Sequence, residues 1–378
     1  MSRKVTDMTA KNIMMSFQLF EGIRTDDGVL EAVRAIPSLC LDGELNCMEN
    51  SPSSIGGYVL LSTNQEGSHV VIHCYKNGLI TVDVQHFEAE KSQDTLLDKI
   101  TVAKTLEMKV RESLGDLCKY SRCLPGEIKR GEITPYFSSG SDILFEYENL
   151  KLMFEKDSKW QNIKIYHNPD VGHFLCLDDD IMIGESDLIY TQTLLGINRN
   201  DFRDKTVLIL GGGDGGLLYE LLKENPRHVL MAEIDEDVVL ACRTHMRIVC
   251  ESAMDSFEGP NYKILFEDCL KVLQECQQEG RKFDYVINDL SEYFINAKNT
   301  KFAYDFETTC IILELSLKIL NQHGKYLSRG NCATDTEFLH TYEDVIRHLD
   351  MKFQKSEVYV PSFKENYCLY EVWREQET

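Results

Sequence analysis

The 378-residue sequence lacks the patterns that mark several common classes of protein. No apolar run approaches the ~18–20 residues that a membrane-spanning helix needs, so we expect no membrane partner. There is neither an H-E-x-x-H nor a G-x-S-x-G motif, so zinc hydrolase and serine hydrolase chemistry are unsupported. Basic side chains are the minority, because 40 Lys and Arg face 62 Asp and Glu for a net charge of −22. Binding to phosphates needs a basic face, so this balance argues against a nucleic-acid partner.

Paired cysteines are also lacking. The thirteen cysteines form no C-x-x-C pair, and the closest two are Cys118 and Cys123, so a cysteine metal site is not expected. The sequence begins with MSRK and shows no signal-peptide pattern, from which we expect a cytoplasmic protein with reduced thiols. The excess of acidic residues has two explanations, either solubility alone or a cationic ligand that a negative field attracts.

Residues 1–120 have the pattern of a small α+β domain. The spacing of apolar residues predicts a helix over 26–36 and a longer helix that Ser92 caps. Asn77-Gly78 predicts a hairpin with a type I′ turn. The free face of the sheet is either a dimer surface or a surface packed on the rest of the chain. The expected strands are 58–63, 69–75 and 79–87.

The rest of the chain predicts two further domains. Residues 121–180 alternate like short antiparallel strands and are expected to form a small β domain. Strands and helices then alternate, which predicts an α/β domain over 181–378 with a mostly parallel, doubly wound, Rossmann-like sheet. Ligands of such sheets bind at the carboxyl ends of the strands. The expected strands are 207–210, 229–234, 262–266, 285–287, 325–328, 357–360 and 368–373, and the helices are 216–224, 269–278, 302–320 and 335–349.

A glycine-rich segment, LGGGDGG over residues 210–216, follows the first strand of that domain and opens a helix. Gly211, Gly213 and Gly216 satisfy G-x-G-x-x-G, which fits dinucleotide binding, methyl transfer from S-adenosylmethionine, a related chemistry or only a tight turn. A carboxylate at Asp214 would repel a pyrophosphate at the helix N-terminus and would attract a sulfonium or an ammonium group. The loop therefore favours a nucleoside that carries positive charge.

Acidic residues lie at the ends of the next three strands. Glu233 can accept hydrogen bonds from both ribose hydroxyls, with a solvated strand end as the alternative. Asp268, followed by Cys269, is either a ligand-binding residue or a helix N-cap. Asp289 follows an apolar strand and is a candidate general base, with a helix cap as the alternative. Together with Asp214, these residues predict an anionic pocket with no basic residue nearby in sequence.

The segment VLILGGGDGGL (207–217) with Glu220 resembles the signature of the aminopropyltransferases, the spermidine and spermine synthases. WQNIKI (160–165) and ESDLIYT (185–191) resemble further blocks of this family. DYVINDL (284–290) and the additional N-terminal domain are most similar to the animal-type spermine synthase branch. The resemblance implies a methyltransferase-type Rossmann-like catalytic domain, and an N-terminal domain that resembles S-adenosylmethionine decarboxylase and mediates a homodimer.

For the donor, the resemblance implies decarboxylated S-adenosylmethionine as a co-substrate, methylthioadenosine as the product, no tightly bound cofactor and no metal. Glu233 would bind the ribose, and Asp268 would lie near the adenine amino group. The residues implied in donor binding are Gln161, Gly211, Gly213, Glu233, Asp268 and Cys269.

For the acceptor, the resemblance implies spermidine and hence a spermine synthase. Tyr190 and Asp214 would hold the acceptor amine beside the sulfonium, and Asp289 would accept its proton. Glu365, helped by Phe363, would bind the distal ammonium.

Two departures from the family pattern concern the acceptor. Phe363 stands where spermine synthases have Tyr and lacks its hydroxyl, and Ser291 replaces a Thr. A spermidine or thermospermine synthase is therefore an alternative. Two alternatives lie outside this class: a methyltransferase, whose ligand carries a carboxylate that Asp214 would repel, and an inactive homologue that serves as a dimeric scaffold.

Overall fold

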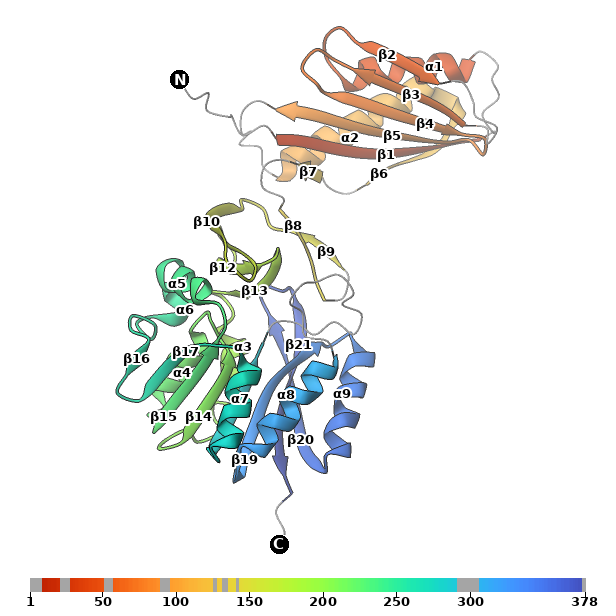
Figure 1. Ribbon diagram of the computed structural model, residues 1–378. Coiled ribbons are helices and arrows are strands. Elements are labelled where there is room, and N and C mark those ends of the chain that lie inside the picture. The colour runs from red at the N-terminus through yellow and green to blue at the C-terminus, as the bar shows by residue number, and fades with distance from the viewer. Residues whose placement is uncertain are drawn as a thin grey trace, which may run out of the picture. The chain divides into compact units, whose positions relative to one another are not determined.

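The structure is a computed structural model that describes residues 9–20, 28–50, 57–88, 96–124, 128–130, 135–140, 143–290 and 306–375 (Figure 1). Ser92 and Ser291 lie outside these ranges. None of the helices in the described ranges is long and apolar enough to cross a membrane. All thirteen cysteines have free thiols.

The chain divides into two compact units, Met1–Thr134 and Pro135–Thr378. The boundary lies beyond residue 120, where we expected it, because two later strands pair with β1 (Thr9–Leu19) of the N-terminal sheet. These strands are β6 (Cys118–Cys123) and β7 (Ile128–Arg130). The first part of the segment expected to form a separate β domain therefore belongs to the N-terminal unit.

The N-terminal unit is an antiparallel sheet with two helices on one face. Its order is β2-β3-β4-β5-β1-β6, with β7 also paired to β1. Every second side chain along these strands points to the face that the helices cover. These side chains pack with Val33 and Ile36 of the first helix and Val110 of the second. The sequence patterns did not predict β1. The remaining bounds are β2 (Asn46–Asn50), β3 (Gly57–Thr63), β4 (His69–Tyr75), β5 (Leu79–Glu88), α1 (Gly28–Cys40), α2 (Leu96–Leu114) and η1 (Gly115–Leu117).

The β4–β5 hairpin is present, but the predicted type I′ turn is wrong. That turn needs positive φ at both central residues, and of Asn77 and Gly78 only Gly78 has it, at 81°. The Gly78 N–H donates to the Tyr75 carbonyl oxygen (3.0 Å), and the Asn77 side-chain oxygen accepts from the Leu79 N–H (3.2 Å). The chain thus turns through a longer loop that ends on a left-handed glycine.

The C-terminal unit contains a small antiparallel sheet in the order β10-β11-β12-β13 and a β8–β9 hairpin. Helix α5 (Glu236–His245) contacts β10 and β11, so this sheet packs against the larger α/β part of the unit. The bounds are β8 (Tyr136–Ser138), β9 (Leu144–Glu146), β10 (Lys151–Asp157), β11 (Asn162–Asn168), β12 (Gly172–Leu177) and β13 (Asp180–Gly184).

Eight of the described strands form the main sheet, in the order β16-β17-β15-β14-β18-β19-β21-β20. The strands from β17 to β19 in this order run parallel, whereas β21 and β20 are antiparallel additions. The order reverses at β14, so the ligand crevice is expected at its carboxyl end. The expected Rossmann-like α/β fold is confirmed. The bounds are β14 (Thr206–Gly211), β15 (His228–Glu233), β16 (Glu258–Gly259), β17 (Tyr262–Phe266), β18 (Phe283–Asp289), β19 (Leu320–Cys332), β20 (Met351–Val360) and β21 (Glu365–Arg374).

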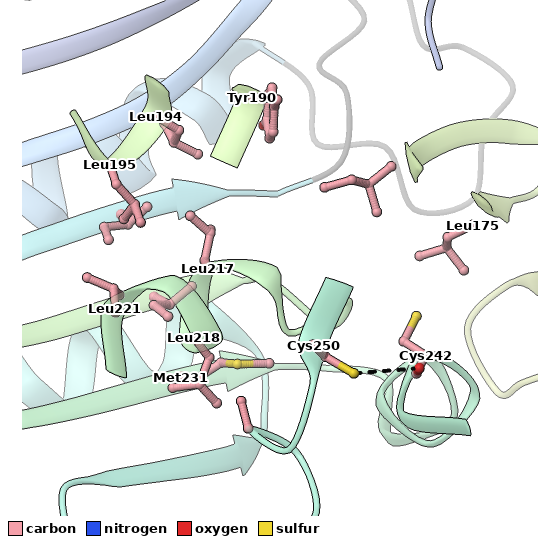
Figure 2. Packing of buried hydrophobic residues seen from close by; sticks show 14 of the residues in the cluster. Leu175, Tyr190, Leu194, Leu195, Leu217, Leu218, Leu221, Met231, Cys242 and Cys250 are labelled. Carbon is pink, nitrogen blue, oxygen red and sulfur yellow. Dashed lines mark hydrogen bonds between the residues drawn. The ribbon is translucent and has the colours of Figure 1, made fainter. Parts of the chain in front are cut away.

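Helices cover both faces of this sheet. Val207 and Ile209 of β14 pack with α3, α4, α5 and α6, and Figure 2 shows part of this cluster. Leu208 and Leu210, which alternate with them, pack with α7, α8 and α9. Figure 1 shows these three helices together on one face of the sheet. The alternation explains why the central strands are continuously apolar. The bounds are α3 (Leu188–Leu195), α4 (Gly216–Lys223), α6 (Arg247–Cys250), α7 (Cys269–Gln278), α8 (Phe306–Lys318) and α9 (Thr336–His348).

Candidate active site

A cavity of about 410 Å³ lies at the carboxyl ends of β14, β15 and β18, where the strand order reverses. It brings together all the site residues expected from the sequence except Phe363 and Glu365, which are not among the described residues that line it. The predicted residues in its lining are Gln161, Tyr190, Gly211, Gly213, Asp214, Glu233, Asp268, Cys269 and Asp289.

The glycine loop lies directly against the ends of the two neighbouring strands. A Cβ atom on Gly211 would lie 2.7 Å from the backbone oxygen of Asp289, and Gly211 also has a positive φ of 79°. A Cβ atom on Gly213 would lie 2.8 Å from a carboxylate oxygen of Glu233. Both contacts are too close for any side chain, so the two glycines allow the acidic residues to approach the loop.

One end of the cavity carries Glu233 and Asp268, each held by a neighbour in sequence. Glu233 accepts a hydrogen bond from the Asp235 N–H (2.9 Å), and burial raises the pKa of Glu233 to about 7. Asp268 is the N-cap of α7 and accepts from the Leu270 N–H (2.8 Å). The helix-cap alternative for Asp268 is therefore correct, and the same residue also lines the cavity.

Asp235 holds Gln161 at this end of the cavity. The sequence patterns did not predict this contact. The Gln161 Nε2 donates to the Asp235 carboxylate (3.1 Å), and the Ser158 hydroxyl donates to the same oxygen (2.6 Å). A carboxylate only accepts hydrogen bonds, so the amide nitrogen of Gln161 faces Asp235. The contact leaves the side-chain carbonyl of Gln161 available as an acceptor towards other groups.

The other end of the cavity joins a phenol and two carboxyl groups. The Tyr190 hydroxyl, from α3, donates to the Asp289 carboxylate (2.8 Å). Asp214 is buried and accepts from the Gly216 N–H (2.8 Å). Burial raises the pKa of both Asp214 and Asp289, and repulsion from Asp214 raises the pKa of Asp289 further. This pair therefore retains a proton to higher pH than ordinary carboxyl groups do.

A guanidinium group also lines the cavity, which corrects the expectation of a purely anionic pocket. Arg329 lies on β19 and is 6% exposed, with its Cζ atom 5.4 Å from the centre of the Tyr367 ring. Its charge lowers the pKa of Asp289 and so opposes the effect of burial. The sequence around Arg329 did not indicate that this residue lines the cavity. The pairing of β19 with β18 and β21 brings it there.

Phe363 and Glu365 lie where the chain turns from β20 into β21. The Phe363 ring is buried and packs on the Tyr367 ring, with 4.9 Å between ring centres. Glu365 accepts a hydrogen bond from the Gly140 N–H (2.7 Å). The Tyr367 ring in turn contacts Arg329, so Phe363 is linked to the described cavity lining through Tyr367.

Comparisons with known proteins cover mainly the C-terminal unit. Residues 187–378 match the spermine/spermidine synthase domain, and residues 136–185 match the spermidine synthase tetramerisation domain. A polyamine aminopropyltransferase 1 from Hyperthermus butylicus is 30% identical over 236 residues, which are 60% of this chain and 76% of that protein. A polyamine aminopropyltransferase from Pectobacterium carotovorum is 27% identical over 48% of this chain, and the chain spans 59% of its length.

A solved spermidine synthase in complex with the transition state analogue AdoDATO shares the fold. The TM-score is 0.54 at 18% identity, and the match covers 66% of this chain and 82% of that one. These two relatives are an archaeal and a bacterial protein, so they give no support to the animal-type branch in particular.

Proposed function

Because this chain belongs to the spermine/spermidine synthase family, we propose that it is a spermine synthase, which transfers an aminopropyl group from decarboxylated S-adenosylmethionine to spermidine. The observation that carries the proposal is the cluster of Tyr190, Asp214 and Asp289 beside the glycine loop. Buried carboxylates favour a sulfonium and an amine over a phosphate-bearing ligand.

The donor would occupy the end of the cavity formed by the glycine loop, Glu233, Asp268 and Gln161. Glu233 would accept hydrogen bonds from the ribose hydroxyls, and Asp268 and Cys269 would lie at the adenine. The side-chain carbonyl of Gln161, left available by Asp235, would accept a further hydrogen bond from the donor. Asp214 would lie beside the positive sulfur.

In the reaction, the lone pair of the acceptor amine forms a bond to the propyl carbon next to the sulfur. The carbon–sulfur bond breaks, its electron pair stays on sulfur, and neutral methylthioadenosine leaves. An alkylamine has a pKa of about 10 and must first lose a proton, which Asp289 accepts. The raised pKa of Asp289 suits this role, because a general base works best when its pKa is near the working pH. The Tyr190 hydrogen bond orients the Asp289 carboxylate.

We also propose that the protein is a cytoplasmic homodimer that associates through the free face of the N-terminal sheet. Val59, Leu61, Val71 and Leu79 alternate with buried residues, so they project from the face opposite α1 and α2. These half-buried apolar side chains would be covered by the same face of a second copy. Sedimentation of the intact protein tests this, and a monomer at micromolar concentration would contradict it.

The function is tested by a mass-detected assay with decarboxylated S-adenosylmethionine and either spermidine or putrescine. We expect spermine and methylthioadenosine with spermidine and little product with putrescine. Product with putrescine and none with spermidine would make the protein a spermidine synthase. Thermospermine as the product from spermidine would mean that the other end of spermidine reacts. No product from either amine would contradict the proposal and favour methyl transfer or an inactive scaffold.

A further inference from the structure

Arg329 is the one residue described above in the cavity that the proposed reaction leaves without a role. Its guanidinium is always charged at physiological pH. It packs over the ring of Tyr367, which is 1% exposed, so an aromatic surface holds the charge in place. The charged and titratable groups that share the cavity end with it are Asp289 of β18, Asp214 of the glycine loop and Tyr190 of α3, with Glu233 of β15 beyond them.

Arg329 begins a row of side chains that leads away from Asp289. Arg329 pairs directly with Leu369 on β21, so it projects from the same face of the sheet as Leu369, Tyr367 and Glu365. The row therefore runs from Asp289 past Arg329 and Tyr367 to Glu365. Its order is an acidic group, a cation, an aromatic ring and a second acidic group.

We propose that Arg329 is a specificity-determining residue that sets the spacing between the amino groups of the acceptor. The inference rests on the proposed function and extends it to the chemistry of the acceptor. An acceptor whose reacting nitrogen lies at Asp289 and whose chain extends towards Glu365 passes Arg329. Methylene groups are accepted beside the guanidinium, which lines the cavity, but a second ammonium there is repelled. Amines whose next charge lies beyond Arg329 are therefore favoured.

The same reasoning predicts which end of spermidine reacts. The next nitrogen lies three carbons from the primary amine at one end of spermidine and four carbons at the other. The longer spacing carries the second charge further past Arg329. The four-carbon end is therefore the favoured nucleophile, and attack from that end gives spermine and not thermospermine.

The test is kcat/KM for a series of linear diamines with three, five and seven carbons, at saturating donor. For the native protein we expect kcat/KM to rise roughly five- to tenfold along the series, from the difference in repulsion at short and long separation. Arg329→Gln should flatten the series, and Arg329→Lys, which keeps the charge, should preserve the rise. An unchanged rise in Arg329→Gln would overturn the proposal. Binding of methylthioadenosine to each variant reports that the cavity is intact.

A comparison within the native protein does not depend on any variant. Propylamine and heptylamine lack the second charge of the corresponding diamines. We expect 1,3-diaminopropane to be a poorer acceptor than propylamine and the seven-carbon diamine to be better than heptylamine. If the diamine were better than the monoamine at both chain lengths, or poorer at both, the role of Arg329 would be overturned while the transferase activity remained. Failure to transfer the aminopropyl group to any amine, spermidine included, would instead contradict the proposed function.

Discussion

The two ends of the cavity are built in different ways. At the end proposed for the nucleoside, Glu233 and Asp268 are held by backbone N–H groups two residues further along the chain. At the end proposed for the amine, the hydrogen-bonded Tyr190 and Asp289 are 99 residues apart. Outside the described cavity lining, Glu365 and Gly140 are 225 residues apart. Local contacts thus hold Glu233 and Asp268, with Gln161 as the exception at that end because Asp235 lies 74 residues away. The second end depends on how helices and strands far apart in the sequence come together.

The two ends also differ in charge. Glu233 shares its end with polar groups, and burial is the main cause of its raised pKa. The amine end combines two carboxyl groups, a phenol and the Arg329 guanidinium, and charges within this group shift the pKa values of Asp289 and Tyr190. Substitutions at the amine end should therefore have large effects on the reaction with the amine. Their effects on nucleoside binding should be small.

The largest expected effect comes from Asp289→Asn. Without a proton acceptor, kcat should fall by about 10²–10⁴. Methylthioadenosine should still bind within about twofold of the native affinity, because the nucleoside end is unchanged. Stopped assays and calorimetry measure the two quantities. Tyr190→Phe, which keeps the carboxylate and removes the hydrogen bond that orients it, is the matched control and should cost about tenfold. A native kcat in Asp289→Asn would exclude Asp289 as the base.

A smaller effect is expected from pH on donor binding. Glu233 and Asp289 have pKa values raised to about 7, so their carboxyl groups take up protons as the pH falls through neutrality, and burial also raises the pKa of Asp214. Each protonation removes a negative charge that attracts the sulfonium. The Kd of decarboxylated S-adenosylmethionine should therefore rise by roughly tenfold from pH 8 to pH 6, since one pKa unit corresponds to one tenfold step.

Methylthioadenosine is the control ligand for this measurement, because it lacks the sulfonium charge. Its Kd should change less over the same range, and binding of the charged donor should release protons at neutral pH. Calorimetry in two buffers of different ionisation enthalpy measures that release. Equal pH dependence for the two ligands would mean that the amine-end carboxyl groups do not contact the sulfonium. Asp214→Asn should reduce the difference between them.

The same contrast explains what the sequence could predict. The glycine loop, Glu233 and Asp268 follow apolar strands with recognisable local patterns, so their meeting at one sheet edge could be predicted. The position of Arg329 could not, because it depends on how β19 aligns with β21. Strand β1 was missed although buried Ile13 and Phe17 alternate with half-buried polar residues, a period-2 pattern that only the apolar Met14 interrupts. The position of Asp235 beside Gln161 likewise required the small antiparallel sheet to pack on α5.

The smallest expected effect is that of Glu365→Gln, which tests how far the amine end extends. Glu365 lies outside the described cavity lining, so its contribution should be limited to the distal charge of a long acceptor. The side-chain carbonyl of Gln can still accept the Gly140 N–H, so the variant isolates the loss of charge. The KM for spermidine should rise about two- to fivefold, as for a partly exposed ion pair, with no change for the donor.

Glu357→Gln is the matched control for this variant, because Glu357 is an exposed carboxylate on the neighbouring strand that accepts from Asn366 (2.7 Å). It should leave both KM values unchanged. If Glu365 binds the distal ammonium, its substitution should affect the seven-carbon diamine and leave propylamine unaffected, since only the diamine carries a charge that far from Asp289. Equal increases in the KM of donor and acceptor would place Glu365 outside the amine end, and the row of side chains would then end at Tyr367.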